Sequence, residues 1–349
     1  MKPENLNCPL PIGDHKTVQL AHGGGGRLMH NLIRDLFLSA FESPELAAME
    51  DCATFSLPGG RLAFSTDSYV VDPLFFPGGD IGELAVNGTV NDLSLSGATP
   101  VYLSVGFILE EGFPIVDLRR ILLSMRRAAE KAEVVIAAGD TKVVEKGKAD
   151  KVFINTSGIG VLPGSCTLRP ANIKPGDQIL LSGTIADHGM AVMCKREGLG
   201  FEAQIESDTA PLNDLVAKIL DVQKGAVHAL RDPTRGGIAS VLNEFAEVAE
   251  LEIRLYEERI PVRPAVAGAC ELLGLDPVYV ANEGKLIAAV APEQADRILG
   301  ALRAHQLGRD AAIVGEVVSD HPGRVSMRTE VGGWRIVDML VGEQLPRIC

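Results

Sequence analysis

The chain has 349 residues, of which 46% are hydrophobic and 23% are charged, so a largely disordered protein is excluded. It carries 33 Lys and Arg against 46 Asp and Glu, which gives a net charge of −13. Such an acidic balance argues against nucleic acid or an anionic membrane surface as a partner. Any phosphate ligand must therefore be bound locally, by a metal ion or a few well-placed groups.

The length predicts about two domains at roughly 150 residues each, and the first spans residues 17–163 after an N-terminal extension over 1–16. A glycine cluster at 23–26 precedes the first apolar-periodic segment, and Asp80 with Glu83 is typical of a helix N-cap. The expected elements are, in order, a helix over 27–41, a strand over 61–71, a helix over 81–96, a strand over 101–109, a helix over 115–132, and strands over 134–138 and 152–159.

The second domain is expected over 164–338, beginning between the turn clusters at 163–164 and 174–177. Its expected elements are a strand over 178–181, helices over 189–194, 211–223, 238–250 and 265–273, a strand over 285–290, and a helix over 292–304. Strands and helices do not alternate strictly, which favours two α+β domains over a doubly wound sheet. Residues 339–349 are predicted to be a flexible, extended tail of roughly 35 Å.

The six cysteines are scattered, with no C-x-x-C pair that would indicate a zinc ribbon or a redox motif. The N-terminus has no apolar core of a signal peptide, and no apolar stretch reaches about 18 residues. We therefore expect a cytoplasmic protein with reduced thiols and no membrane span. Cys349 is unusual because it ends the chain, and an exposed thiol there is open to oxidation.

Three aspartates are placed at strand ends or in glycine-rich turns: Asp67, Asp92 and Asp140. Carboxylates in such positions bind Mg²⁺ together with water and phosphate oxygens, and Lys142 could reach the same phosphates. Each aspartate alone is more often a helix cap or a turn residue. Three of them together, in an acidic chain, favour a metal–phosphate site.

Two further segments carry polar residues next to glycine. In RDPTRGGIAS, Asp232 and the pair Gly236 and Gly237 lie where the amides of a helix N-terminus can approach an anion, although a plain N-cap explains them equally well. In ANEGKL, Glu283 directly precedes a strand, where a solvated loop residue is the common alternative. The residues alone thus indicate a two-domain enzyme that uses a magnesium nucleotide.

Seven segments taken together resemble the hydrogenase maturation factors of the HypE family, within the aminoimidazole-ribotide-synthetase-like superfamily. The resemblance covers nearly the whole chain after the first 17 or so residues. The segments are AHGGGGRLM, FSTDSYVVDPLFFPGGDIGELAVNGTVNDLSLSGA, GFILEEG, GDTKVV, LRDPTRGG, ANEGKL and the terminal PRIC.

The resemblance implies two α+β domains with an ATP cleft between them, and a first-domain sheet that pairs across a homodimer. It implies that a HypF-type carbamoyltransferase loads a carbamoyl group onto Cys349. ATP then drives dehydration to a thiocyanate, whose cyano group goes to iron on a HypC–HypD scaffold.

The resemblance also suggests roles for the residues already singled out. Glu283 is the candidate base, and Lys142 acts on phosphate or on the developing oxyanion. The Mg²⁺–ATP set is Asp67, Asp92 and Asp140, and the cleft is lined by Asn91, Asn155, Asp232, Gly236 and Gly237. The alternatives are another superfamily kinase or ligase that acts on a free small molecule, and an adaptor that uses its tail only to dock.

Overall fold

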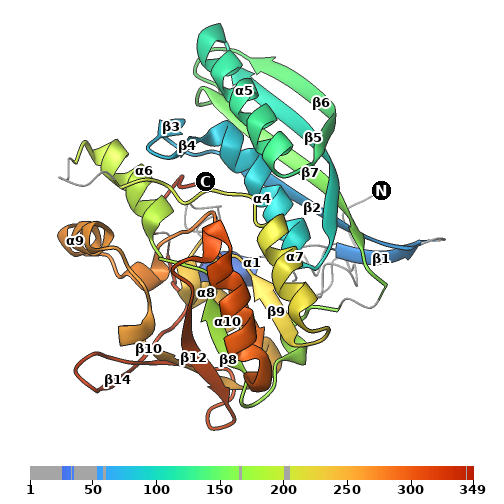
Figure 1. Cartoon of the computed structure of the whole chain (residues 1–349). Helices are drawn as coiled ribbons and strands as arrows, with labels where there is room; N and C mark the ends of the chain where they lie inside the picture. Colours follow the sequence, from blue (N-terminus) through green and yellow to red (C-terminus); the bar gives the residue numbers. More distant parts are fainter. Residues whose placement is uncertain are drawn as a thin grey trace, which may run out of the picture.

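The computed structural model describes residues 26–32, 34, 53–57, 60–164, 167–199, 205–342 and 344–349. The two large sheets come from residues before and after the segment 163–177, and they lie in the upper and lower parts of Figure 1. The expected extension over 1–16 and most of the expected helix over 27–41 lie outside the described residues. Of that helix, the structure describes α1 (Arg27–Leu32). No helix in the described ranges is long and apolar enough to cross a membrane.

The first domain is a five-stranded sheet with two helices on one face (Figure 1). Its spatial order is β1, β2, β7, β5, β6, and only the β5–β6 pair is parallel. The strands are β1 (Ala53–Leu57), β2 (Gly60–Tyr69), β5 (Thr99–Glu110), β6 (Val135–Val144) and β7 (Val152–Leu162), and a short β3 (Phe75–Phe76) pairs with β4 (Gly79–Asp80). The helices are α4 (Ile81–Leu95) and α5 (Ile115–Lys131).

The two helices begin and pack for different local reasons. The Asp80 carboxylate caps α4 by accepting hydrogen bonds from the N–H groups of Gly82 (2.8 Å) and Glu83 (3.1 Å). This helix is buried almost all round because it lies between the sheet and the second domain. In α5 one apolar stripe that includes Ile121 and Met125 faces the sheet, as the 3.6-residue spacing predicts.

The second domain contains a seven-stranded sheet in the order β14, β13, β10, β12, β8, β11, β9. Its strands are β8 (Gln178–Leu181), β9 (Val227–Arg231), β10 (Glu252–Tyr256), β11 (Ile287–Val290), β12 (Ala312–Val318), β13 (Val325–Arg328) and β14 (Trp334–Ile336). Ile179 and Leu181 belong to one apolar core and Leu180 to another, so this sheet is covered on both faces.

The helices of the second domain fall into three groups. The first face of the sheet carries α8 (Gly237–Ala249), and the opposite face carries α7 (Asn213–Val222) and α10 (Ala295–Ala304). The third group, α6 (Asp187–Glu197) and α9 (Pro264–Leu273), packs against the core of the first domain. The predicted mixed α+β architecture is confirmed, whereas strands β9, β10 and β12–β14 were not anticipated from the sequence.

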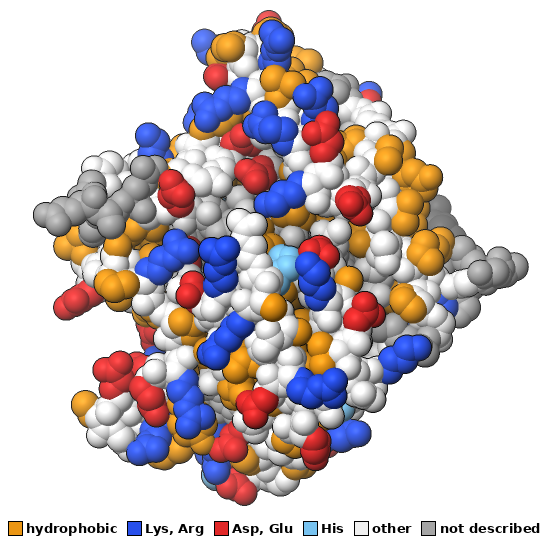
Figure 2. Space-filling model, viewed as in Figure 1, with side chains coloured by type: hydrophobic (Ala, Val, Ile, Leu, Met, Phe, Trp, Pro, Cys, Tyr) orange, Lys and Arg blue, Asp and Glu red, His pale blue; other side chains and the backbone are white. Residues whose placement is uncertain are grey.

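The open face of the first sheet, the face away from α4 and α5, carries exposed apolar side chains. In β2 the burial alternates, so Ala63, Ser65 and Tyr69 are buried while Phe64 is 41% exposed. Hydrophobic side chains gather along the right-hand margin of the molecule in Figure 2. The exposed apolar residues on this open face are Phe64, Tyr102, Ile108, Val135, Ile159 and Val161.

Candidate functional site

The C-terminal tail is docked against the first domain, which corrects the expectation of a free extended tail with an exposed thiol. Just beyond β2, the Val70 N–H donates to the Cys349 main-chain oxygen (3.0 Å) and the Asp72 N–H to the Arg347 carbonyl (3.2 Å). Leu345 and Ile348 join the core of the first domain. Apolar burial and main-chain hydrogen bonding therefore hold residues 344–349 in place.

The Cys349 thiol lies among charged side chains from both domains. Burial raises its pKa to about 12, and the negative charges of Glu283 and Asp67 act in the same direction. The Arg235 guanidinium opposes them and hydrogen-bonds the thiol. The sulfur is thus held protonated at neutral pH, next to a buried carboxyl group and a cation.

Glu283 is the most unusual titratable group in this environment. Burial raises its pKa well above the usual range, and the nearby Asp232 and Asp208 carboxylates raise it further. Its Oε1 atom is buried and has no hydrogen-bond partner among the described residues. A carboxyl group that is enclosed, raised in pKa and open at one oxygen has the properties of a proton-transfer group.

Three other residues of ANEGKL explain how Glu283 is held. Asn282 accepts a hydrogen bond from the Ala186 N–H (2.8 Å), and Lys285 forms an ion pair with Asp208 (3.0 Å). A Cβ atom on Gly284 would lie 1.8 Å from the Asp208 carbonyl oxygen, so only glycine fits there. The Glu283 N–H donates to the Asp208 carboxylate (3.1 Å), which fixes the backbone at the reactive position.

Two of the predicted metal aspartates lie at this same site, around the Tyr69 hydroxyl. Tyr69 lies 3.4 Å from the Asp67 carboxylate, and burial together with Asp67 and Asp92 raises the pKa of Tyr69. Ser65 donates to Asp92 (2.7 Å). A Cβ atom at position 88 of α4 would lie 2.2 Å from the Tyr69 oxygen, so Gly88 makes this approach possible.

These donors fit a magnesium site with two protein ligands. Mg²⁺ in nucleotide sites commonly takes one or two carboxylates, completed by water and phosphate oxygens. Asp67 and Asp92 supply two carboxylates beside the unpartnered oxygen of Glu283. Among the described residues, no group of three or more His, Cys, Asp or Glu side chains is placed to hold a metal ion by protein ligands alone.

Asp140, Lys142 and Asn155 do not join this cluster within one chain. Asp140 and Lys142 are exposed on the edge strand β6, where they pair with each other (3.5 Å). Asp140 and Asn155 are both in register with Gly106, and Asn155 donates to Ser68 (3.0 Å) on the open face.

The expected single set of three metal aspartates is therefore not assembled in one chain. Asp67 belongs to β2 and Asp140 to β6, three strand spacings or roughly 14 Å apart. Their side chains also leave the sheet on opposite faces, because Asp67 follows the buried face of β2 and Asp140 shares the face of Asn155.

The remaining predicted residues hold the frame of the site. The Asn91 side chain donates to the Ala210 and Glu283 carbonyls (3.1 and 3.3 Å) and accepts from the Leu212 N–H (2.8 Å), so main-chain groups engage both of its polar atoms. It ties α4 to the segment that carries Glu283.

Asp232 is buried close to Glu283, whose pKa it raises. Gly236 and Gly237 both have positive φ at the start of α8, and a Cβ atom on Gly237 would lie 2.6 Å from the Val278 carbonyl oxygen. Glycine at position 237 is thus required for α8 to begin this close to the 278–280 segment.

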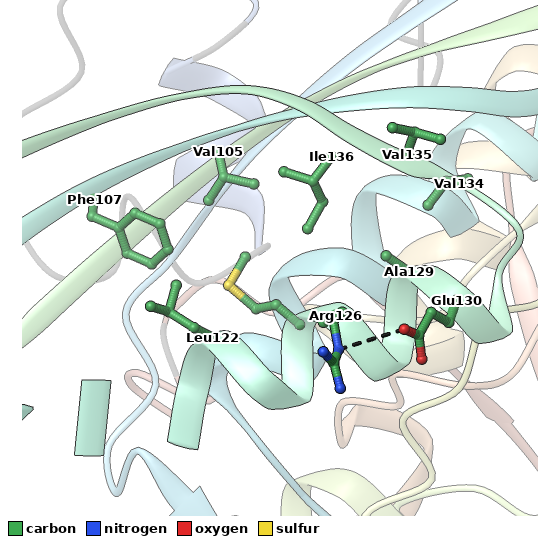
Figure 3. Close-up of a pocket in the computed structure, with 10 residues that line it drawn as sticks. Val105, Phe107, Leu122, Arg126, Ala129, Glu130, Val134, Val135 and Ile136 are labelled. Atoms are coloured by element: carbon green, nitrogen blue, oxygen red, sulfur yellow. Dashed lines mark ion pairs between the residues drawn. The ribbon is translucent and has the colours of Figure 1, made fainter. Parts of the chain in front are cut away.

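A separate pocket of ≈ 340 Å³ opens between α5 and strands β5 and β6 (Figure 3). Its walls are apolar, with Leu122 facing Phe107, and Met125 also lines it. Its charged groups are Arg126 and Glu130, which pair with each other (3.4 Å). This lining includes no titratable group besides that pair, whereas the Cys349 site brings together a thiol, a carboxyl group of raised pKa and a cation.

Comparison with known proteins shows the family of the chain. The family models of the AIR synthase related protein match residues 49–162 with the N-terminal domain and 174–328 with the C-terminal domain. A carbamoyl dehydratase HypE from Rhizobium leguminosarum bv. viciae is 56% identical over 332 residues, which are 95% of each protein. The chain belongs to the HypE family.

Solved structures of HypE proteins share the whole architecture. One, from a HypE–HypF complex, is 50% identical with a TM-score of 0.84, and the match covers 88% of this chain and 99% of that one. Another, HypE in complex with ATP, is 50% identical with a TM-score of 0.80 over 95% and 100% of the two chains. The two AIR synthase related domains predicted from the HypE resemblance are confirmed.

Sequence reasoning missed four residues that complete the site. Arg235 and Tyr69 were within quoted family segments, but no local pattern distinguished them from their neighbours. His188 and Arg196, both in α6, contact the docked tail, and their role is visible only once the tail has been placed.

Proposed function

We propose that this chain is an ATP-dependent carbamoyl dehydratase that acts on its own terminal cysteine and produces a protein-bound thiocyanate for hydrogenase maturation. The observation that carries the proposal is the docked Cys349 thiol beside Glu283, whose buried oxygen has no partner in the described residues. The relatives named carbamoyl dehydratase HypE and the ATP-bound HypE structure support it.

The chemistry requires activation of a poor leaving group. The oxygen of the S-carboxamide attacks the γ-phosphorus of ATP, so that an O–P bond forms and ADP leaves. Removal of two N–H protons and departure of phosphate then leave S–C≡N, and the elements of water end up in the phosphate and the released protons. Glu283 takes an N–H proton, because it is the buried carboxyl group that faces Cys349.

The other side chains hold charge in place. Mg²⁺ held by Asp67 and Asp92 would neutralise phosphate charge, and the rest of such a transfer is mainly positioning. Arg235 hydrogen-bonds the sulfur and balances the surrounding carboxylates. Asp232 keeps the pKa of Glu283 high, and Gly236 and Gly237 at the start of α8 would support phosphate.

Partners follow from the same chemistry. A HypF-type carbamoyltransferase loads Cys349, as the HypE–HypF complex of a relative supports, and a HypC–HypD scaffold receives the cyano group. Both steps need the tail to leave its docked position. A free thiol also has to stay reduced, which places the reaction in the cytoplasm.

We further propose a homodimer in which a second copy covers the open face of the first sheet. The exposed apolar side chains there support it, as does the position of β6 at the edge of the sheet formed by the described strands. Tyr102→Glu should convert the dimer to a monomer in size-exclusion chromatography with light scattering. Val331→Glu, at a position 94% exposed outside this sheet, is the matched control and should leave the dimer intact.

Intact-mass spectrometry tests the dehydratase directly. After incubation with the carbamoyltransferase, carbamoyl phosphate and ATP, Cys349 should carry a carbamoyl adduct that subsequently loses one water. An adduct that never loses water would contradict the dehydratase function and favour the adaptor alternative. Turnover of ATP on a free small molecule, independent of Cys349, would favour the kinase or ligase alternative.

A further inference from the structure

The last four residues of the chain are bound through their main chain. Every one of their main-chain carbonyl positions accepts a hydrogen bond from another part of the protein. The donors are Arg196 for Pro346 (2.8 Å), Arg196 and the Asp72 N–H for Arg347 (2.8 and 3.2 Å), His188 for Ile348 (2.8 Å) and the Val70 N–H for Cys349 (3.0 Å). The tail is therefore held in one register.

Arg196, on α6, is the central donor. Two of its nitrogens bind successive tail carbonyls, and its Nε donates to the Asp72 carbonyl (2.8 Å) just beyond β2. One guanidinium thus joins the second domain, the first domain and the tail. Hydrogen bonds from a charged donor are stronger than neutral ones, so Arg196 contributes strongly to the polar binding of the tail.

His188, the second residue of α6, has a fixed protonation pattern. Because the Ile348 carbonyl can only accept, Nε2 carries the hydrogen, and Nδ1 accepts from the Ser207 hydroxyl (2.8 Å). Burial lowers the pKa of His188, which keeps the ring neutral. Phe76 packs edge-on against the ring at 5.4 Å between centroids and fixes its orientation.

The tail also contributes side chains that recognise the same surface. The Arg347 Nε donates to the Val70 carbonyl (2.9 Å), its guanidinium pairs with Asp150, and Ile348 is buried. Arg347 has φ +53°, a conformation that non-glycine residues adopt only where their surroundings hold them. A tail that is not held by specific contacts would relax out of this conformation.

We propose that Arg196, His188 and the Val70–Asp72 main chain form a peptide-binding site that measures the position of the terminal residue. Resting on the proposed dehydratase function, this site brings the Cys349 sulfur to Glu283 in a single register. Arg196 and His188 are positioning residues, since they contact the tail backbone and not the reacting group. Because one residue spans about 3.4 Å of extended chain, a shift by one residue moves the sulfur out of reach.

Alkylation of the unmodified full chain tests the binding site without any carbamoylation. Each cysteine is followed by peptide mass spectrometry during reaction with iodoacetamide. Arg196→Ala should increase the alkylation rate of Cys349 by about tenfold or more, because the charged donor of two carbonyl bonds is lost. Buried Cys194 and Cys270 should stay protected, which separates tail release from unfolding.

Lys195, the exposed neighbour of Arg196 on α6, provides the matched control, and Lys195→Ala should behave as the unchanged protein. Arg196→Lys should give an intermediate rate, since one ammonium cannot reproduce the fork of a guanidinium. An unchanged Cys349 rate in Arg196→Ala overturns the proposal. An increase in the alkylation rate that Cys194 and Cys270 share with Cys349 also overturns it.

Register is tested by two insertions of one alanine, after Gly342 and between Ile348 and Cys349. The first lies before the bound residues and should keep Cys349 protected and competent for dehydration. The second should still accept a carbamoyl group but lose dehydration. Equal dehydration by both overturns the register proposal, whereas no dehydration even in the parent chain overturns only the dehydratase function.

Discussion

The two faces of the first sheet are built from the same strands but carry different halves of the expected site. On the covered face, Asp67 and Tyr69 of β2 meet the tail, α4 and Glu283. On the open face, Thr66 and Ser68 bind Asn155 instead. Because side chains alternate along a strand, residues adjacent in a motif can serve two different environments.

The two faces also differ in how complete they are. The covered face brings a thiol, a carboxyl group of raised pKa, a cation and two aspartates together within one chain. On the open face Asp140 and Lys142 pair with each other, among exposed apolar side chains. The covered face is thus ready for chemistry, while the open face has the composition of a surface that another protein covers.

Replacing the thiol should have the largest effect on the covered face. Cys349→Ala removes the attachment point, so no carbamoyl adduct should form at all, while ATP binding is retained because the aspartates stay in place. Intact mass and calorimetric titration of ATP measure the two properties. An adduct elsewhere on this variant would show that the tail is not the substrate.

Removing the candidate base should have the next largest effect. Glu283→Gln keeps the shape of the side chain but cannot take a proton, so dehydration should slow by about 10²- to 10⁴-fold. Carbamoylation and ATP binding should change little. Equal losses in ATP binding and dehydration would instead assign Glu283 a structural role.

The sequence predicted the parts of the site that local patterns encode. Asp80 as the cap of α4 and the apolar stripe of α5 follow from spacing alone and are present. The docking of the tail could not be foreseen, since its partners Val70 and Arg196 are separated from it by more than a hundred residues. Such contacts depend on tertiary packing.

That the aspartates lie on two different faces of the sheet could not be predicted from the sequence, for a different reason. Asp67 lies within the strand expected over 61–71 and Asp140 just after the one expected over 134–138, but which face each one takes depends on strand register. A slip of one residue reverses the face, and no local pattern fixes it in an exposed edge strand. Family segments therefore identified which residues matter but not how they divide between the two faces.

The pH dependence of Cys349 alkylation sharpens the description of the covered face. Docking raises the thiol pKa from 9.0 to about 12, so the docked tail holds its proton more tightly than a released tail does. Docking is thus strongest below pH 9 and weakens about tenfold per pH unit from there to about pH 12. Alkylation of Cys349 should keep rising between pH 9.5 and 11, while a free tail peptide levels off. A protein profile that levels off with the peptide would contradict enclosure of the thiol.

A mixed dimer tests whether the two faces form one site across two chains. Asp92→Asn should block dehydration from the covered face, and Asp140→Asn from the open face, in their respective homodimers. If the open face of one copy serves the covered face of the other, a heterodimer of the two variants keeps one intact site of its two. It should therefore recover about half of the unchanged rate.

Co-expression with two different affinity tags isolates this heterodimer, and single-turnover loss of water from Cys349 measures its rate. A heterodimer of unchanged and Asp92→Asn chains should also show half activity, which calibrates the measurement. If both groups act within their own chain, every chain of the mixed dimer lacks one of them and no activity returns. Full activity of the Asp140→Asn homodimer would remove Asp140 from the site, leaving the open face a purely structural surface.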